Sequence, residues 1–501
     1  MGDYTIAVFD IGKTNKKLLL YDSDLKCLTP GEEGVAIPQI VSGSILCDDA
    51  GAIYSWMMGA LSAAAAAYRD IRCISITTHG ATLALLGREA DAVFEGDGGL
   101  VFPVVSYEHE IPACDDQAFY EAAGESPERL QELTGTCRLG HLLNAARQVF
   151  WLRRRFGERF SRATDVLMWP QYFGYLLTGE KAAEPTCLGC HGYLLDIIGR
   201  KYSIVADAVG ITDKLPPLPL RKSWEVLGTL KGDIARRTGI APGAVVTVGA
   251  HDSNAALVPY FVKGFKNFVV QDSGTWVVSM SPREEASFEK GETGREVFFN
   301  RSIYGGPVKT TIFRGGAEFE FYGKRVFTGW PHPDRVDRKV LARIARAREA
   351  FAVPGLDRGS GLFPESISRL EGLDTVFRDK THAWSVVDLS LGVEGHYAAQ
   401  LAGGKGTETI FIEGNMARHN PIYTGVIATL SRGVRTFLGD AGGAAFGAAL
   451  MGAAAVEQKR PEQLGERFSL RPAQVEPLHD MAEDIDAYAQ ALLDRLGVRL
   501  P

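Results

Sequence analysis

The chain has 501 residues, of which 46% are hydrophobic and 23% charged, with a formal net charge of −7 at pH 7. This length exceeds what one hydrophobic core usually organises, so we expect two domains. The negative net charge argues against nucleic acid as a partner. Asp3 and Asp10 interrupt the only early apolar stretch, and the Ala-rich run at 59–67 is shorter than the roughly 20 residues of a membrane span. Seven scattered cysteines fit a reducing cytoplasm.

Apolar runs and amphipathic helical patterns alternate through the first half of the chain, which is typical of an α/β fold. The patterns predict helices at residues 53–68 and 144–160, and strands at 73–78, 83–86, 101–106 and 244–249. Residues 4–9 form a further apolar run, and a second one follows at 17–21. The first domain is expected to span 1–256.

The second half begins with apolar runs at 267–271 and 276–280, and 409–413 reads as another strand. Helical patterns cover 335–351, 393–403, 442–456 and 480–496. No low-complexity linker separates the halves, and we expect the second domain to span 257–501.

Two short segments, far apart in the sequence, read almost alike. Each is an apolar run that ends in Asp, then Gly, then Thr, and each continues into a second apolar run. The first contains Asp10, Gly12 and Thr14, and the second contains Gly274 and Thr275. The pattern predicts two strand–turn–strand hairpins, in which glycine permits a tight turn and a close approach to a ligand.

The first turn carries the residue types needed to bind a polyphosphate. Backbone N–H groups at a glycine turn can hold phosphate oxygens, with Thr14 and Asn15 as further donors. Lys13 and Lys17 can neutralise charge, and Asp10 can hold Mg²⁺ through water. A Walker A loop is rejected, because it needs glycine five residues before Gly12, where the chain has alanine. An ordinary charged turn would be the better interpretation of a single hairpin, and the second copy argues against it.

Asp252 follows a predicted buried strand and precedes a small-residue helix. Open α/β sheets bind ligands at this kind of position. A carboxylate there can deprotonate a hydroxyl nucleophile during phosphoryl transfer. It can also simply cap the helix, and both roles are compatible.

With these motifs in order, the chain resembles the FGGY carbohydrate kinases of the hexokinase–actin superfamily. The likeness rests on the first hairpin, His79-Gly80, the segment 176–180, the Gly-x-His-Asp stretch ending at Asp252, the Ser-Gly-Thr-Trp stretch at 273–276, and a late Gly414-Asn415. The resemblance implies two actin-like (ribonuclease-H-like) α/β domains flanking a cleft, and an enzyme that transfers phosphate from ATP, with Mg²⁺, to a small sugar.

The resemblance also implies roles for individual residues. Asp252 would be the general base and would contact the sugar, and Asp10 would position the metal. Thr14 and Thr275 would contact the phosphates from opposite domains. The nucleotide would be bound by residues of both hairpins and of later glycine turns, namely Gly12, Lys13, Thr14, Asn15, Lys17, Gly274, Thr275, Gly316, Gly414 and Asn415. His79 and Glu108 would line the sugar pocket.

Within the family, the segments 273–276 and 103–107 look most like those of L-rhamnulose and L-fuculose kinases, which implies a 6-deoxyketose or a pentulose. The chain departs from the pattern at Lys13, which precedes Thr14 in the first turn. It also has Tyr107-Glu108-His109 where many relatives have Trp-x-Asp-x-Arg. Because of these departures, the resemblance does not fix which residues contact the phosphates or which sugar is bound. It is compatible with a homodimer.

The sequence is also compatible with two other classes of protein. One is a non-catalytic member of the superfamily that senses a sugar or nucleotide, against which the intact Asp10, Asp252 and Thr275 argue. The other is a haem or redox protein, because Cys187-Leu-Gly-Cys190-His191 matches the C-x-x-C-H pattern. Two small buried thiols in a plain helix are the favoured interpretation of that segment.

Overall fold

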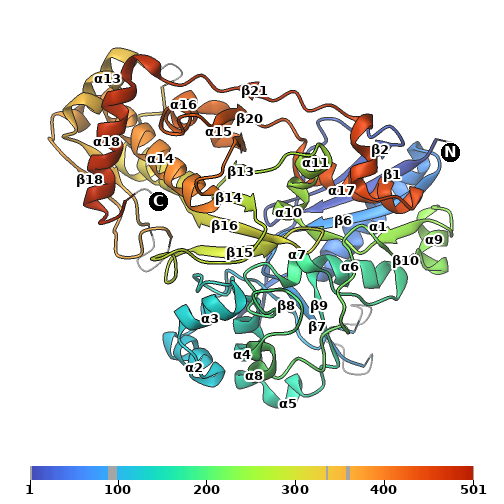
Figure 1. Cartoon of the computed structure of the whole chain (residues 1–501). Coiled ribbons are helices and arrows are strands. Elements are labelled where there is room, and N and C mark those ends of the chain that lie inside the picture. The colour runs from blue at the N-terminus through green and yellow to red at the C-terminus, as the bar shows by residue number, and fades with distance from the viewer. Residues whose placement is uncertain (1–2, 89–98, 334–336, 357–360, 500–501) are drawn as a thin grey trace.

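A computed structural model describes residues 3–88, 99–333, 337–356 and 361–499. Two seven-stranded sheets form the centres of two domains (Figure 1). The two-domain α/β architecture predicted from the sequence is therefore confirmed.

The first sheet is built around β1, with β2 antiparallel on one side and β6 parallel on the other. The sheet runs in the order β10-β11-β6-β1-β2-β3, and β12 pairs with the end of β6. Its strands are β1 (Thr5–Ile11), β2 (Asn15–Asp22), β3 (Val35–Ala36), β6 (Ile71–Thr78), β10 (Val226–Thr229), β11 (Val245–Thr247) and β12 (Ala250–His251).

The second sheet repeats this centre. Strand β13 pairs antiparallel with β14 and parallel with β19, in the order β15-β16-β14-β13-β19-β20-β21. Its strands are β13 (Phe268–Ser273), β14 (Val277–Pro282), β15 (Val297–Arg301), β16 (Pro307–Phe313), β19 (Thr409–Glu413), β20 (Arg435–Leu438) and β21 (Ala473–Gln474). Both predicted hairpins thus form at equivalent places in their sheets, which confirms the duplication.

Helix α1 (Ala50–Ala67) packs one face into the core of the first domain. That face comprises Ala50, Ile53, Met57, Met58, Leu61 and Ala64. By length and composition alone, α1 is apolar enough to cross a membrane. Since its apolar side chains fill the core beside α6 (Trp169–Thr178) and α9 (Gly232–Thr238), we interpret α1 as a core helix.

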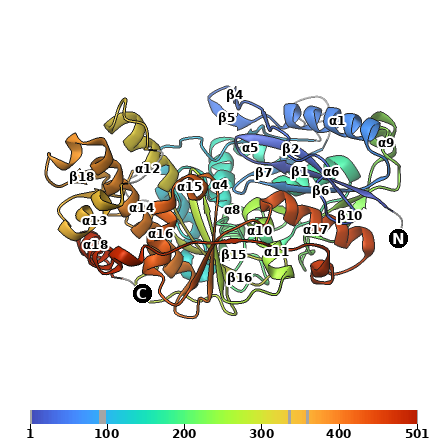
Figure 2. The same cartoon turned by 90° about the horizontal axis from the view of Figure 1, so that it is seen from above.

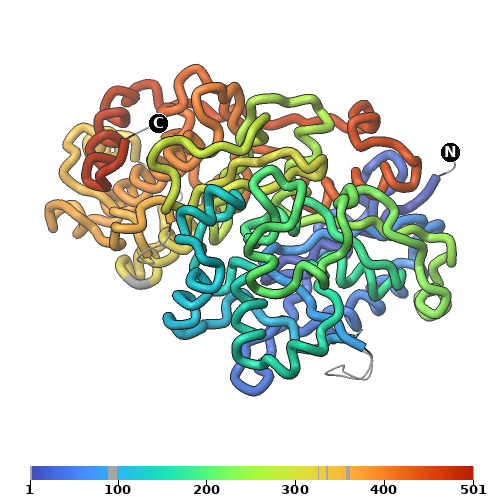
Figure 3. The backbone as a smooth tube through the Cα atoms, turned by 60° about the horizontal axis from the view of Figure 1, so that its bottom comes forward, coloured from blue at the N-terminus to red at the C-terminus, as the bar shows by residue number. Residues whose placement is uncertain are grey.

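A region between β6 and β10 has its own hydrophobic core and lies against strand β15 of the second domain (Figures 1 and 3). It contains the strands β7 (Leu83–Leu86), β8 (Val104–Val105) and β9 (Asp165–Met168) and the helices α2 (Ala113–Ala123), α3 (Pro127–Thr134), α4 (Ala145–Arg155), α5 (Gly157–Phe160), α7 (Pro185–Leu188) and α8 (Ile204–Val209). Two further strands, β4 (Ile40–Ser42) and β5 (Ile45–Asp48), extend β8 into a small sheet.

Helices cover the second sheet around α14 (Lys380–Gly403), which is buried along nearly its whole length. Around it pack α12 (Gly315–Phe321), α13 (Arg338–Ala347), α16 (Pro421–Leu430) and α18 (Ala482–Arg495), with α15 (Asn415–His419) following β19. The short pair β17 (Phe351–Val353) and β18 (Arg369–Glu371) joins this layer.

Late in the chain, α17 (Gly443–Glu457) crosses back to the first domain (Figure 2). Its alanines pack against Ile6, Val8 and Cys73 of the first sheet, beside α10 (Asp252–Ala256) and α11 (Val258–Val262). The domain boundary between residues 256 and 257 therefore stays a prediction. Helix α17 belongs to the second half of the chain but packs into the hydrophobic core of the first domain.

The C-terminal end of α17 is attached to the first strand by a buried carboxylate. Tyr4 donates a 2.6 Å hydrogen bond to Glu457, and Arg467 Nη2 donates one of the same length. Burial alone would raise the pKa of Glu457, but the hydrogen bonds from Arg467, Tyr4 and Lys459 outweigh it and lower this pKa to about 2. The ionised form is therefore the stabilising one.

We expect Glu457→Gln to lower the free energy of unfolding at pH 7 by up to about 3 kcal/mol. Because the folded-state pKa lies below the unfolded value of about 4.3, this contribution is full above that value and is lost as the pH falls toward 2. Urea unfolding of both proteins between pH 3 and pH 8 measures it. A difference that stays constant down to pH 3 would contradict this assignment.

Several predicted elements differ in extent. The strand expected at 101–106 is only Val104–Val105, and the helix at 144–160 breaks at Phe156, whose backbone leaves the helical region. The helix predicted at 335–351 runs over Arg338–Ala347, because Arg348 takes a left-handed conformation and a strand starts at Phe351. Residues 334–336 lie outside the described part of the chain.

Candidate active site

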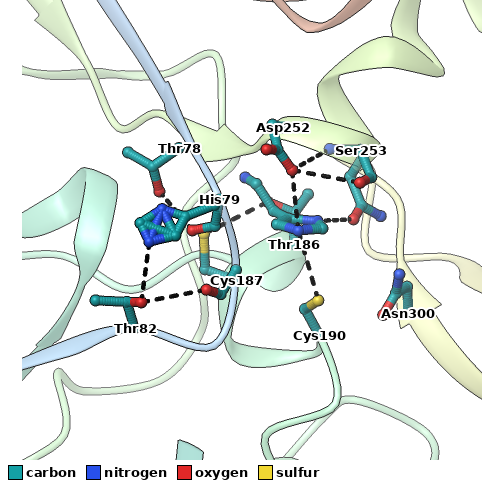
Figure 4. A network of polar contacts seen from close by, with 12 residues as sticks. Thr78, His79, Thr82, Thr186, Cys187, Cys190, Asp252, Ser253 and Asn300 are labelled. Carbon is teal, nitrogen blue, oxygen red and sulfur yellow. Dashed lines mark hydrogen bonds and ion pairs between the residues drawn. The ribbon is translucent and has the colours of Figure 1, made fainter. Parts of the chain in front are cut away.

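Asp252 is the first residue of α10 and lies where β12 ends beside β6. Its Oδ1 accepts a 2.6 Å hydrogen bond from the backbone N–H of the next residue, Ser253 (Figure 4), but His251 holds the N-cap position and no side chain caps α10, so the predicted capping role of Asp252 is wrong. His251 Nε2 lies 3.1 Å from the same oxygen. These contacts use Oδ1, and the carboxylate also lines a pocket, so Oδ2 is left to face a ligand.

His251 is held in place from three sides. Its Nδ1 lies 2.7 Å from Asn254 Oδ1, and its backbone N–H donates to Thr186 Oγ1 at 2.8 Å. Its Nε2 lies 3.8 Å from Cys190 Sγ (Figure 4). Burial alone would lower the pKa of His251, but Cys190 and Asp252 outweigh burial and raise it. A histidine fixed in this way orients Asp252.

The C-x-x-C-H segment supports this histidine. The short helix α7 ends at Leu188, and His191 has φ of 38°, so the plain helix expected there is wrong. Glu184 is fully buried and accepts hydrogen bonds from Thr186 and from the Cys187 backbone N–H. Both thiols are free and buried, as the sequence predicted, and the segment is a scaffold for His251.

A pocket of about 790 Å³ opens in front of Asp252. Residues of both domains line it: Lys13, His79, Gly80, Ala81, Tyr107, Leu139, Leu143, Cys190, His191, His251, Asp252, Ser253, Trp276, Val278, Phe298, Asn300 and Ile312. Asn300 reaches it from strand β15 (Figure 4). A ligand in this pocket therefore contacts both domains at once.

One end of the pocket is polar. His79 lies there, 3.3 Å from Thr82 Oγ1 and 3.8 Å from Asp48 Oδ2. Burial and the charge of Lys13 hold the pKa of His79 well below its usual value, so it is neutral at pH 7. Lys13 forms a 2.7 Å ion pair with Asp48. The predicted sugar residue His79 and the predicted phosphate residue Lys13 thus line the same pocket.

The turn between β1 and β2 exposes two of its predicted ligands and leaves a third, Lys17, half-buried. Thr14 and Asn15 are exposed, where an incoming phosphate can reach them. Lys17 is paired across the hairpin with Asp10, and its charge only partly offsets the burial that raises the pKa of that carboxyl. Lys16, in contrast, is buried and donates to the backbone oxygen of Lys13 at 2.9 Å, so it fixes the turn.

The second hairpin is in close contact with two later glycines. A Cβ on Gly316 would lie 2.2 Å from the Gly274 oxygen, so the first turn of α12 approaches the hairpin at backbone distance. Gly414 has φ of +92°, and a Cβ there would lie 2.7 Å from Asp272 Oδ1. Thr275 is exposed and lines a second pocket of about 980 Å³ beside α12. The predicted Gly274, Thr275, Gly316 and Gly414 therefore cluster, with Asn415 starting α15 directly after Gly414.

The carboxylates of Asp10 and Asp272 each lie within electrostatic range of Asp252. Burial and the charge of Asp252 raise the pKa of Asp10 to about 7. Desolvation by the surrounding protein, with the charge of Asp252, raises the pKa of Asp272 to about 6, although its side chain stays accessible to solvent. Excess negative charge of this kind fits a bound cation.

Among the residues that the structure describes, no group of three or more His, Cys, Asp and Glu side chains forms a metal cage. Mg²⁺ does not need one, because it is usually bound through one or two carboxylates together with substrate phosphates. Asp10, with its carboxylate near that of Asp252, therefore fits Mg²⁺ that arrives with ATP.

Several pocket residues were not predicted from the sequence. Asn300, which lines the pocket, interrupts the apolar run of β15, and Asp48, which binds Lys13 but does not line the pocket, ends the apolar strand β5; both are weak signals for a buried polar site. The apolar residues from the second domain carry no such signal, because they read as ordinary strand positions. Glu108 does not line the pocket, and its side chain is 48% exposed, so its predicted contact with the sugar stays untested.

Comparison with known proteins agrees with this geometry. Residues 5–259 match the N-terminal domain of the FGGY family of carbohydrate kinases, and residues 265–461 match the C-terminal domain of carbohydrate kinase FGGY. The chain belongs to the FGGY family of carbohydrate kinases. Its two-domain α/β architecture is the actin-like fold of that family.

Relatives of known activity are similar at modest identity. The L-fuculokinase of Escherichia coli K12 is 28% identical over 211 residues, which cover 42% of this chain and 41% of that protein. The rhamnulokinase of Bacteroides thetaiotaomicron is 25% identical over 267 residues, which cover 52% and 50%. The chain thus spans about half the length of the curated relatives it matches.

Solved structures are similar over the whole chain. A carbohydrate kinase from Novosphingobium aromaticivorans superposes with a TM-score of 0.79 at 26% identity, covering 99% of both chains. Gluconate kinase from Lactobacillus acidophilus superposes with a TM-score of 0.82 over 99% of this chain and 98% of its own, but at 16% identity. The second likeness shows the fold alone.

Proposed function

We propose that this FGGY kinase phosphorylates a hydroxyl group of a small neutral ketose, with a 6-deoxyketose as the favoured class. The observation that carries the proposal is the pocket in front of Asp252, which has a polar end at Lys13 and His79 and an apolar wall. That wall consists of Leu139, Leu143, Val278, Phe298 and Ile312.

In this proposal Asp252 is the general base. Its free oxygen accepts the proton of the sugar hydroxyl as that hydroxyl attacks the terminal phosphate of ATP. His251 and the Ser253 N–H hold the other carboxylate oxygen in place. A positioned base of this kind contributes roughly 100- to 10,000-fold to the rate.

The two hairpins are assigned to the phosphates. The exposed Thr14 and Thr275 donate hydrogen bonds to phosphate oxygens from opposite domains, and the glycines leave room for the backbone to approach. Asp10 would hold Mg²⁺, which supplies charge neutralisation to the phosphates when it is bound with ATP. Closure of the domains would exclude water, which is itself a competent acceptor.

The apolar wall favours a sugar that ends in a methyl group. A terminal hydroxymethyl group against Phe298 and Ile312 would lose hydrogen bonds to water without replacing them. The similar L-fuculokinase and rhamnulokinase support the same class. All seven cysteines are free thiols, which supports a reducing compartment such as the cytoplasm.

Matched sugar pairs test the substrate class. Release of ADP is measured with L-fuculose against L-tagatose and with L-rhamnulose against L-fructose, since each pair differs only in the 6-hydroxyl group. We expect kcat/KM to be about 10-fold or more higher for at least one 6-deoxy member, since an unpaired buried hydroxyl costs about 1–3 kcal/mol. Equal or higher values for both hydroxylated sugars would contradict the proposed class.

A further inference from the structure

The side chain of Lys13 leaves the phosphate hairpin and enters the polar end of the pocket. Its Nζ donates to Asp48 Oδ1 at 2.7 Å and to Ser106 Oγ at 2.9 Å, and it lies 4.4 Å from the ring centroid of Tyr107. It lines the same pocket as Asp252. Lys13 lies in the turn proposed to bind phosphate, but its side chain is directed at the pocket proposed to bind the sugar.

The positive charge of Lys13 is already compensated. The Asp48 side chain is 8% exposed, and the more exposed Glu108 has its Oε2 at 3.9 Å from Nζ. A phosphate or a sugar carboxylate would have to compete with a close, buried carboxylate partner for this ammonium. A neutral hydroxyl group would not, because it can accept a hydrogen bond without breaking the ion pair.

The ammonium group also has a donor to spare. Lysine carries three N–H donors, and Asp48 and Ser106 accept two of them. Within the described ranges, the third N–H has no acceptor at hydrogen-bond distance. Because Lys16 fixes the backbone oxygen of Lys13, the turn holds the side chain in this direction.

We propose that Lys13 is a sugar-contact residue, which donates its remaining N–H to a hydroxyl oxygen of a neutral sugar. Asp48 is the positioning residue that holds Lys13 and cancels its charge. The pair makes the pocket selective for neutral sugars over sugar acids, because Asp48 and Glu108 repel a carboxylate that Lys13 alone would attract. This inference rests on the proposed function.

The test removes both charges together. In the Lys13→Met/Asp48→Asn protein no buried carboxylate is left unpaired, which protects the fold better than Lys13→Met alone. We expect KM for the ketose to rise about 10- to 100-fold, the cost of a lost charge-assisted hydrogen bond, while KM for MgATP changes less than about twofold. Thermal unfolding confirms that the variant is folded.

Lys17→Met provides the contrast on the same hairpin. Lys17 pairs across the strands with Asp10. We expect this variant to raise KM for MgATP and to leave KM for the ketose unchanged. The opposite pattern, in which removal of Lys13 raises KM for MgATP alone, would show that Lys13 is a phosphate ligand and would overturn the inference.

The Asp48→Asn variant tests whether Asp48 makes the pocket selective against sugar acids or only supports the fold. It uncovers the charge of Lys13, so we expect D-gluconate to inhibit the variant about 10-fold more tightly than wild type, by competition with the ketose. Unchanged inhibition by gluconate, or an unchanged ketose KM in the double variant, overturns the inference while the proposed function stands. A wild-type enzyme that phosphorylates no neutral ketose would contradict both the proposed function and the inference about Lys13.

Discussion

Replacement of Asp252 by asparagine is expected to lower kcat by about 100- to 10,000-fold while sugar binding stays measurable. Asparagine keeps the size of the side chain and an oxygen that can accept the 2.6 Å hydrogen bond from Ser253, but it cannot take a proton. Steady-state ADP release measures kcat, and calorimetry measures ketose binding without nucleotide.

Asp213→Asn is the matched control, because that side chain is 78% exposed on the surface and the same atoms are changed. We expect the control to retain wild-type turnover. An Asp252→Asn enzyme with more than about a tenth of wild-type kcat would contradict the assignment of Asp252 as the general base.

Replacement of Gly316 by alanine is expected to weaken ATP binding strongly. The added Cβ would lie 2.2 Å from the Gly274 oxygen and 3.0 Å from the Thr275 Cα, so the second hairpin or α12 must move. Overpacking of this kind costs about 1–3 kcal/mol, and a displaced Thr275 would lose its phosphate contact. We expect KM for MgATP to rise about 10-fold or more and KM for the ketose to change little.

Gly406→Ala serves as the control for this variant. A Cβ at Gly406 meets no atom within 4 Å, so the same substitution in the same domain adds no clash. We expect its kinetics to match wild type. If Gly316→Ala binds MgATP as tightly as wild type, the proposed place of the nucleotide beside this hairpin is wrong.

The sequence predicted the parts of the site that lie in local motifs. The hairpins around Gly12 and Gly274 are set by short-range turn chemistry and alternating strands, and both form as expected. Asp252 likewise follows a buried strand and starts a helix. Each of these signals lies within about ten residues of sequence, so the local pattern alone determines it.

The sequence did not predict the contacts that only tertiary packing creates. Lys13 reaches Asp48, 35 residues later, and the apolar wall combines Leu143 with Phe298 from the other domain. Helix α17 returns to the first sheet from the second half of the chain, which no local pattern indicates. Periodicity gives the buried face of such an element but not the sheet that it covers.

The central step of the proposed reaction is a phosphate transfer that requires both a neutral ketose and the Asp252 carboxylate. The most direct measurement is ³¹P NMR of wild type and Asp252→Asn with MgATP and L-fuculose or L-rhamnulose. We predict a new phosphomonoester signal that grows with ADP in wild type and is absent over the same time in the variant. A wild-type sample that forms no sugar phosphate with either ketose, or a variant that forms it at the wild-type rate, would contradict the account.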